Sequence, residues 1–183
     1  MTIALNQNPD PVFPKDLLSA SYCGQTWYIA HVKSRREKAL ADFLFRRNIG
    51  YCLPLVKKRQ ASKNRVRYSL VPIFPGYIFV NTDETGRYNI FKSNHASRII
   101  EVVDSETLVR ELNHVNHLLS ADHPVYPVDF LDVGQRVRVK TGYLKGIEGI
   151  ITRKDKKFRL ALAVTSIMQS ISVEIDADMV EPI

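Results

Sequence analysis

Apolar and polar residues alternate along TWYIAHVK, residues 26–33, so that successive side chains point to opposite faces. This alternation predicts a β-strand. Directly after it, Ser34 and Glu37 form a capping-box pattern, and apolar residues then follow at helical spacing until two arginines and Gly50 provide a stop. The first regular elements of the chain are therefore expected to be a strand and a helix.

Further short apolar runs, separated by turn residues, are typical of strands. They are YCLPLV, YSLVPIF, YIFVN and RIIEVV, at residues 51–56, 68–74, 77–81 and 98–103. The polar, basic segment KKRQASKNRVRYS begins at residue 57, and we expect its first part to be an exposed hairpin loop. The leucines of SETLVRELNHVNHLLSA, from residue 105, share one helical face. Together these patterns predict a small α+β domain, an antiparallel sheet with flanking helices.

The stretch VPIFPGYIFV, residues 71–80, contains a strand that is apolar on both faces. If Ile78 and Val80 pack against the helices, Tyr77 and Phe79 lie on the opposite face. By the same parity, Ile29 and His31 of the first strand lie on that face, and Phe74 at the turn adds a further aromatic ring. Aromatic side chains on a free sheet face are typical of protein-binding surfaces. The alternative is that the C-terminal domain or the N-terminal tail covers this face.

After residue 120 the pattern changes. ADHPVYPVD has neither the helical nor the strand period, which indicates a linker. Beyond it RVRVK, EGIITR, FRLALAV and ISVEI are separated by glycines, and such short strands predict a small barrel that stays β rather than helical. The expected organisation is a flexible extension (1–21), an α+β domain (22–120), a linker (121–130) and a β-barrel (131–183).

The charge is concentrated in one part of the chain. The net charge is +7, and between Trp27 and Leu70 there are twelve Lys or Arg against two acidic residues. A local excess of this kind is the electrostatic footprint of phosphate-backbone binding, although a solvated, solubilising surface would have the same composition.

Other classes of protein find little support in the sequence. No apolar run approaches the roughly 20 residues that span a bilayer, and the N-terminus does not resemble a signal peptide, so we expect a cytoplasmic protein. Two cysteines without metal-ligand spacing predict reduced thiols. The five histidines are scattered, and His114 and His117 fit a polar helix edge better than a metal site. We therefore expect no enzymatic activity and no cofactor.

Three segments carry a resemblance. WYIAHVK, FPGYIFV and VGQRVRVKTGYLKGIEGII, in that order, resemble the N-terminal (NGN) domain and the SH3-like KOW barrel of the NusG family of transcription elongation factors. The resemblance implies that the N-terminal sheet docks on the clamp of the largest catalytic subunit of RNA polymerase and opposes pausing or termination. The residues it assigns to this contact are Ile29, His31, Phe74, Tyr77 and Phe79.

Other positions look more like the specialised relatives of the RfaH kind. Their basic residues contact the non-template DNA strand, and the matching positions here are Lys33, Arg35, Arg36 and Arg98. Housekeeping members carry Ile-Phe-Gly-Arg in the barrel, where this chain has SIMQSISVEI, which argues against recruitment of Rho. A small-subunit ribosomal protein stays a candidate partner of the barrel. The residues assigned to that contact are Leu144, Ile147 and Met168.

Two alternatives stay open at this stage. A ribosome-associated KOW-type RNA-binding protein would suit both the barrel and the charge. A housekeeping NusG that acts with Rho would share the same domain order. Copurification with polymerase or with ribosomal subunits separates the first alternative from an antitermination factor.

Overall fold

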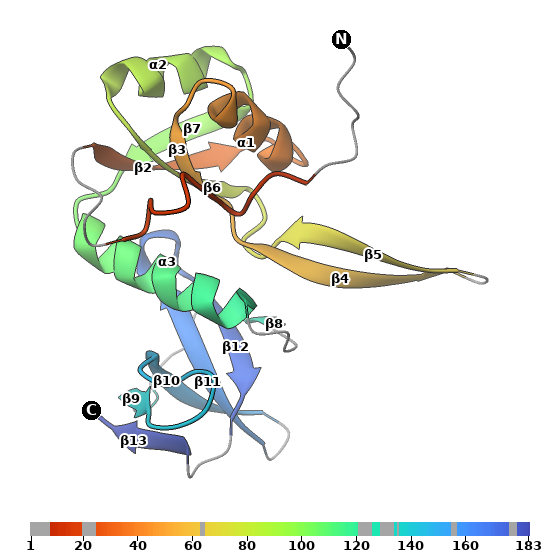
Figure 1. The fold of residues 1–183 in the computed structure, drawn as a ribbon, viewed down its shortest axis with the longest axis vertical. Coiled ribbons are helices and arrows are strands. Elements are labelled where there is room, and N and C mark those ends of the chain that lie inside the picture. The colour runs from red at the N-terminus through yellow and green to blue at the C-terminus, as the bar shows by residue number, and fades with distance from the viewer. Residues whose placement is uncertain are drawn as a thin grey trace. The chain divides into compact units, whose positions relative to one another are not determined.

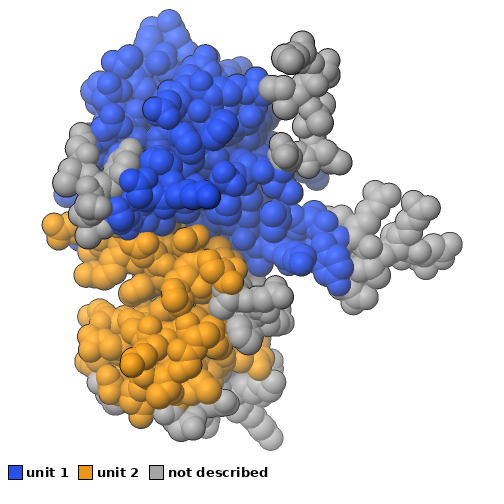
Figure 2. Space-filling model, in the orientation of Figure 1, with its two compact units in different colours: residues 1–105 blue, residues 106–183 orange. Residues whose placement is uncertain are grey.

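The computed structural model describes residues 8–19, 25–62, 65–120, 126–128, 134, 136–154, 157–175 and 179–183. The chain divides into two compact units, residues 1–105 and 106–183, coloured separately in Figure 2. The first unit mixes helices with an antiparallel sheet, and strands dominate the second. The predicted α+β fold class is confirmed.

Unit 1 is built on a five-stranded antiparallel sheet with the strand order β1-β3-β6-β2-β7. One face of this sheet packs against both helices of the unit: Ala30, Ile78 and Val80 share a core with Leu40 of α1 and Ile90 of α2. The apolar side chains on one face of the strands therefore form the core beneath the helices. The elements are β1 (Val12–Phe13), β2 (Thr26–Val32), α1 (Glu37–Phe45), β3 (Gly50–Cys52), β6 (Tyr77–Thr82), α2 (Glu84–Lys92) and β7 (Ala96–Glu101) (Figure 1).

Both helices of unit 1 begin differently from the sequence expectation. The residue before α1 is Arg36, which makes no capping hydrogen bond through its side chain, so the predicted capping box of Ser34 and Glu37 does not form. The sequence reading missed α2 altogether. Its signal was Asp83, whose carboxylate accepts a hydrogen bond from the Gly86 N–H at 2.7 Å and caps the helix.

The N-terminal segment is ordered where the structure describes it, although the sequence predicted a flexible extension over 1–21. Residues 12 and 13 form β1 and pair with β3, and the Leu53 N–H donates to the carbonyl of Pro11 at 2.7 Å. Leu17 and Leu18 are buried. Two buried leucines and one short strand attach this segment to unit 1. A strand of two residues is too short to show a period in the sequence.

The two remaining strands of unit 1, β4 (Leu55–Ser62) and β5 (Arg65–Pro72), pair only with each other. Their register runs from Leu55 opposite Pro72 to Ser62 opposite Arg65. Figure 1 shows this two-stranded ribbon extending away from the five-stranded sheet. The expected hairpin loop from residue 57 is therefore wrong, because the strands continue through the basic segment almost to the turn.

Unit 2 contains one long helix, α3 (Ser105–Ser120), and a six-stranded antiparallel sheet. All four strands that the sequence predicted here are present, and β8 and β13 were not predicted. The order is β13-β9-β10-β11-β12-β8, for β8 (Tyr126–Val128), β9 (Arg136–Val139), β10 (Glu148–Lys154), β11 (Lys157–Val164), β12 (Gln169–Glu174) and β13 (Val180–Pro182).

Helix α3 groups with the C-terminal sheet, whereas the sequence placed the domain boundary after residue 120. The Glu111 carboxylate accepts hydrogen bonds from the N–H and the hydroxyl of Thr165, at 3.0 and 2.6 Å. These contacts join residues 54 positions apart, so the periodicity of the helix could not reveal them. Apart from β8, the expected linker 121–130 lies outside the described residues.

Candidate functional site

The candidate binding residues of unit 1 lie on the sheet face opposite α1 and α2. In the strand register, Ile29 pairs with Phe79 and His31 pairs with Tyr77. Directly opposed residues of an antiparallel pair point to the same face. Since Ile78 and Val80 belong to the core beneath the helices, the other parity faces away from it. The predicted face assignment of these four residues is therefore confirmed.

Exposure on this face changes from one end of the strands to the other. The row formed by Cys52, Phe79 and Ile29 is buried, and Ile100, which continues this row on β7, is 40% exposed. The next row consists of Tyr77, which is half-buried, followed by His31 and Arg98, which are exposed. The expectation of an open aromatic face holds only at this second row.

Phe74 and Phe79 are buried side chains, contrary to their expected exposure. Phe79 is 0% exposed, and the Phe74 ring meets it edge to face with 6.3 Å between the centroids. Part of the reason lies in the N-terminal segment. Gly50 of β3 is paired with Asn81 of β6, so a side chain at Gly50 would point to the same face as that of Asn81. A methyl carbon of Leu17 lies 2.9 Å from the position that a Cβ at Gly50 would take. The tail therefore covers the β3 end of this face.

His31 is held in a defined orientation. The Ser97 hydroxyl donates to the carbonyl of His31 at 3.0 Å, and the same hydroxyl lies 3.0 Å from ring Nδ1. The Ser97 hydroxyl thus contacts both the backbone and the ring of His31, and which ring nitrogen donates depends on the tautomer. The ring also meets Tyr77 edge to face, at 5.2 Å between centroids. The site thus combines an aromatic ring, an imidazole and a guanidinium in one row.

Glu37 fixes the turn beside this row, a role that the sequence did not suggest. Its buried carboxylate accepts a hydrogen bond from the Gly76 N–H at 2.9 Å. The carbonyl of Gly76 accepts from the Val32 N–H at 2.7 Å. Gly76 has φ = +84°, a conformation that side chains other than hydrogen disfavour. The Pro75-Gly76 turn is therefore anchored to both α1 and β2.

The predicted DNA-binding residues Lys33, Arg35, Arg36 and Arg98 are all exposed. The Lys33 N–H donates to the carbonyl of His95 at 2.9 Å, and its ammonium group donates to Asn94. Partial burial lowers the pKa of His95, and the nearby charges of Arg36 and Lys33 lower it further. Lys33, Arg36 and His95 therefore share one neighbourhood. Arg98 lies beside His31 in the register of β2 and β7.

Two of the three predicted partner-binding residues in unit 2 are core residues. Leu144 and Ile147 are buried, because the turn that carries them folds back on β9: the Gly146 N–H donates to the carbonyl of Val139 at 2.9 Å. Their assignment as surface contacts is corrected accordingly. Met168 is 70% exposed and has a left-handed backbone, φ = +51°. Tyr143 is an exposed aromatic residue in the same turn that the prediction missed.

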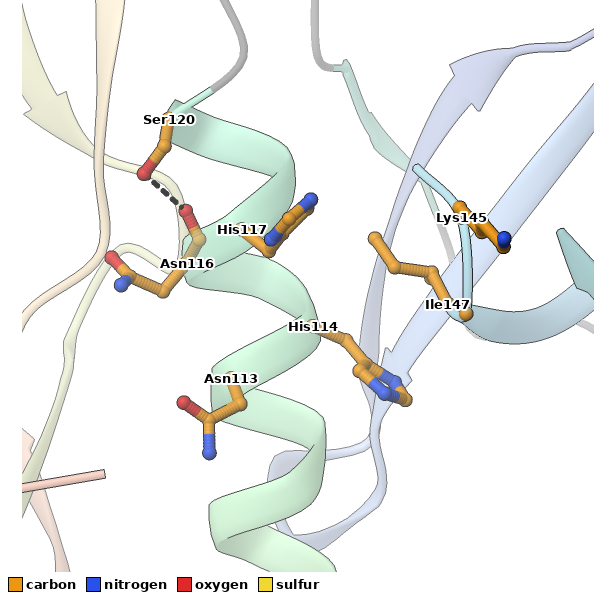
Figure 3. A pocket seen from close by; sticks show the side chains of 8 residues that line it. Asn113, His114, Asn116, His117, Ser120, Lys145 and Ile147 are labelled. Atoms are coloured by element: carbon orange, nitrogen blue, oxygen red, sulfur yellow. Dashed lines mark hydrogen bonds between the residues drawn. The ribbon is translucent and has the colours of Figure 1, made fainter. Parts of the chain in front are cut away.

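A shallow pocket of unit 2 lies between α3 and the segment Lys145–Ile147 (Figure 3). His114 and His117 point toward that segment, and a ring nitrogen of His117 hydrogen-bonds to the carbonyl of Tyr143 at 2.8 Å. Burial lowers the pKa of His114. Within the described part of the chain, no cluster of three or more His, Cys, Asp or Glu residues is placed to hold a metal ion. His117 is thus tied to the turn that carries Tyr143, and His114 lines the pocket.

Two further properties bear on the class of protein. No described helix combines the length and the apolar character needed to cross a membrane. Cys52 is buried and unpaired, and burial raises the pKa of its thiol. Cys23 lies outside the described residues.

Comparisons with known proteins agree with this architecture. The chain matches the family described as "Transcription termination factor nusG" over residues 25–133. It is 24% identical, over 184 residues, to the transcription termination/antitermination protein NusG of Borreliella burgdorferi, with 87% of this chain and 99% of that protein covered.

Two solved structures resemble the chain. One, described as "Domain interaction in Thermotoga maritima NusG", gives a TM-score of 0.50 at 17% identity and covers 87% of this chain and 98% of its own. The other is described as "Crystal Structure of MjSpt4:Spt5 complex conformation B". It is 16% identical, covers 86% of this chain and 96% of its own, and has a TM-score of 0.29.

An α+β unit followed by a unit that carries a six-stranded antiparallel sheet thus has the fold of a NusG-type transcription factor. The family match spans more than half of the 183 residues, so this chain belongs to the NusG family of transcription termination and antitermination factors. The match ends at residue 133, before most of the C-terminal sheet.

Proposed function

We propose that this protein is an antitermination factor that binds RNA polymerase through the exposed row of Tyr77, His31 and Arg98. The observation that carries the proposal is the register of β2 with β6 and β7, which supports one continuous surface made by three strands. Tyr77 supplies apolar contact area, His31 an oriented imidazole and Arg98 a charge. Tyrosine and arginine are residue types that often dominate binding energy.

The buried residues of the original assignment have a supporting role in this proposal. Ile29, Phe74 and Phe79 lie beneath or beside the row and fix its strands. The turn held by Glu37 keeps Tyr77 in place. The polymerase clamp, the element that the family resemblance implies, would then contact His31 and Tyr77 directly and the aromatic core only indirectly.

The exposed basic residues next to this row are proposed to contact the non-template DNA strand. Lys33 and Arg36 are close enough to His95 to depress its pKa, and Arg98 belongs to the row itself. A positively charged surface beside an imidazole suits a single strand, which binds through its phosphates and through stacking of its bases. Arg35 extends the same surface along the chain.

We further propose the specialised rather than the housekeeping role. The segment SIMQSISVEI lacks the Ile-Phe-Gly-Arg pattern, and only Met168 among the three predicted contacts is exposed. Rho is therefore not proposed as a partner. A small-subunit ribosomal protein that contacts Met168 and Tyr143 is the proposed partner of the KOW-like sheet.

The test is a pull-down of core RNA polymerase with tagged full-length protein. The variant is His31→Ala with Tyr77→Ala, and the control is Tyr88→Ala with Phe91→Ala, which removes two exposed rings from α2. Loss of an anchor contact of about 2 kcal/mol weakens binding by roughly 30-fold, so the variant should fail to retain polymerase and the control should retain it. Equal retention by a folded variant and its control would refute the proposed row.

The ribosome-associated alternative receives less support, because the family match covers the N-terminal α+β unit rather than the C-terminal sheet alone. The same preparation decides between the two. Retention of ribosomal subunits without polymerase would favour the alternative.

A further inference from the structure

The two-stranded ribbon of β4 and β5 has an extreme charge. From Leu55 to Pro72 the sequence contains six Lys or Arg and no acidic residue. Lys57 and Lys58 are exposed, and Tyr68 is 62% exposed. The ammonium group of Lys57 lies 5.5 Å from the centre of the Tyr68 ring. The ribbon therefore presents cations and an aromatic ring to the solvent on a segment that pairs with no other strand.

The strand register sorts these residues into two faces. Directly opposed residues share a face, so Lys58 with Ser69, Gln60 with Arg67 and Ser62 with Arg65 form one of them. These six positions are all polar and three are cationic. The other face carries the remaining strand cations, Lys57 and Arg59, with Tyr68. One face of the ribbon is thus a polar, basic strip without apolar positions beyond its root.

The root of the ribbon is anchored in the core of unit 1. Leu55 is buried in the helix-covered core, and Leu70 packs against it. The Ile73 N–H donates to the carbonyl of Pro54 at 3.0 Å, which closes the base of the hairpin. The ammonium group of Lys38, on α1, donates to the carbonyl of Leu70. The root of the ribbon is therefore attached to unit 1 by packing and by hydrogen bonds.

The dimensions of the ribbon fit a nucleic acid groove. Strands of eight residues extend for about 25 Å at the usual rise per residue. Two strands lie roughly 5 Å apart, and the major groove of B-form DNA, about 12 Å wide, admits a two-stranded ribbon. We propose that β4 and β5 form a binding arm for double-stranded DNA that inserts its basic face into the major groove.

The geometry favours duplex DNA over the other nucleic acids. The major groove of A-form RNA is deep and narrow, so a ribbon of this width does not enter it. A single strand is usually bound by stacking on several aromatic residues, and the ribbon from Leu55 to Pro72 has Tyr68 as its one aromatic residue. Lysine and arginine at six positions mainly supply phosphate contacts. Affinity for duplex DNA of mixed sequence is therefore expected.

This inference does not rest on the proposed function. None of His31, Tyr77 and Arg98 belongs to the ribbon, and the DNA-binding experiment uses no polymerase. Loss of polymerase binding and loss of duplex binding can therefore be observed separately.

The test is fluorescence anisotropy of a labelled 20-base-pair DNA duplex titrated with the full-length protein at several salt concentrations. The variant Lys58→Gln, Arg65→Gln, Arg67→Gln removes three charges from the basic face. The control Lys15→Gln, Lys140→Gln, Lys145→Gln removes three exposed charges elsewhere, so both proteins have the same net charge. A third protein, Lys58→Arg, Arg65→Lys, Arg67→Lys, keeps every charge of the face.

Each lost phosphate contact lowers the slope of log affinity against log salt by about 0.9. The ribbon variant should therefore lose about 2.7 units of slope and at least tenfold in affinity, while the control and the charge-conserving protein keep the slope of the original. The original should also bind the DNA duplex more tightly than an RNA duplex of equal length. Affinity for a single strand of equal length should fall no more for the ribbon variant than for the control. Equal slopes for the ribbon variant and the control would overturn the proposal. So would equal or tighter binding of the RNA duplex, a larger loss of single-strand affinity for the ribbon variant than for the control, or no binding of the DNA duplex at all.

Discussion

Two strand pairs of unit 1 have similar length and opposite properties. In the five-stranded sheet, β2 and β6 pair over six positions, and their side chains are buried on both faces over most of that length. In the ribbon, β4 and β5 pair over eight positions, and the described cations of β4 are exposed. Backbone hydrogen bonds are common to both pairs, so the difference between them lies in which side chains each pair carries and in how far the described ones are covered.

The comparison separates residues that hold the fold from residues that are available for binding. Side chains such as Phe79 have no access to a partner and stabilise the sheet. The described exposed side chains of the ribbon, Lys57, Lys58 and Tyr68, lie outside the helix-covered core that contains Leu55. The row of Tyr77, His31 and Arg98 lies between these extremes, since it is part of the sheet and still reaches the solvent.

The largest expected effect is on stability. Phe79→Ala, a truncation inside the sheet, should lower the free energy of unfolding of unit 1 by about 3–5 kcal/mol. Tyr68→Ala, on the ribbon, should change it by no more than about 0.5 kcal/mol. Urea unfolding followed by the fluorescence of Trp27, the single tryptophan and a residue of β2, reports on unit 1. Similar losses for the two variants would break the comparison.

A smaller effect is expected at the turn beside the exposed row. Glu37→Ala leaves the Gly76 N–H without its partner and should cost about 1–3 kcal/mol in the same unfolding experiment. Glu37→Gln keeps an acceptor oxygen at this position and should cost clearly less. If both variants were equally stable, the hydrogen bond would not be what anchors the turn.

The smallest effect concerns the basic neighbourhood of His95. Partial burial and the charges of Arg36 and Lys33 lower its pKa below the ordinary value of about 6.5. The folded state therefore takes up this proton less readily than the unfolded state, and stability falls as the pH drops below about 6.5. Arg36→Gln should raise the pKa of His95, still below the ordinary value because burial remains. Arg46→Gln, at a salt-bridged surface position, is the control.

An NMR titration of the His95 ring measures both changes. A pKa that does not respond to Arg36→Gln would show that these two groups are too far apart to form one surface.

The sequence could predict the features that depend on local period. Strand parity assigned Ile29, His31, Tyr77 and Phe79 to one face, because alternation is a property of each strand by itself. Four of the six strands of the C-terminal sheet, β9 to β12, followed from the same alternation between glycines. The helix from residue 105 was also found from its spacing of leucines.

Coverage of a surface could not be predicted, because it depends on segments far away in the chain. Phe74 and Phe79 looked like exposed anchors, and only the folded structure shows them buried, with Leu17 over one end of the same face. Leu144 and Ile147 were also expected to be surface contacts, and they are buried because their turn folds back on β9. The exposed positions Tyr143 and Tyr68 carry no local signal that separates them from core aromatics.

The central claim, a polymerase-binding row at the exposed end of the sheet, is tested most directly by hydrogen–deuterium exchange of the full-length protein with and without core RNA polymerase. Bound polymerase should slow exchange in residues 29–33, 76–79 and 96–98, and exchange in the exposed helix α2 should stay unchanged. Protection confined to α2 or to the C-terminal sheet, with no change in those three segments, would contradict the account.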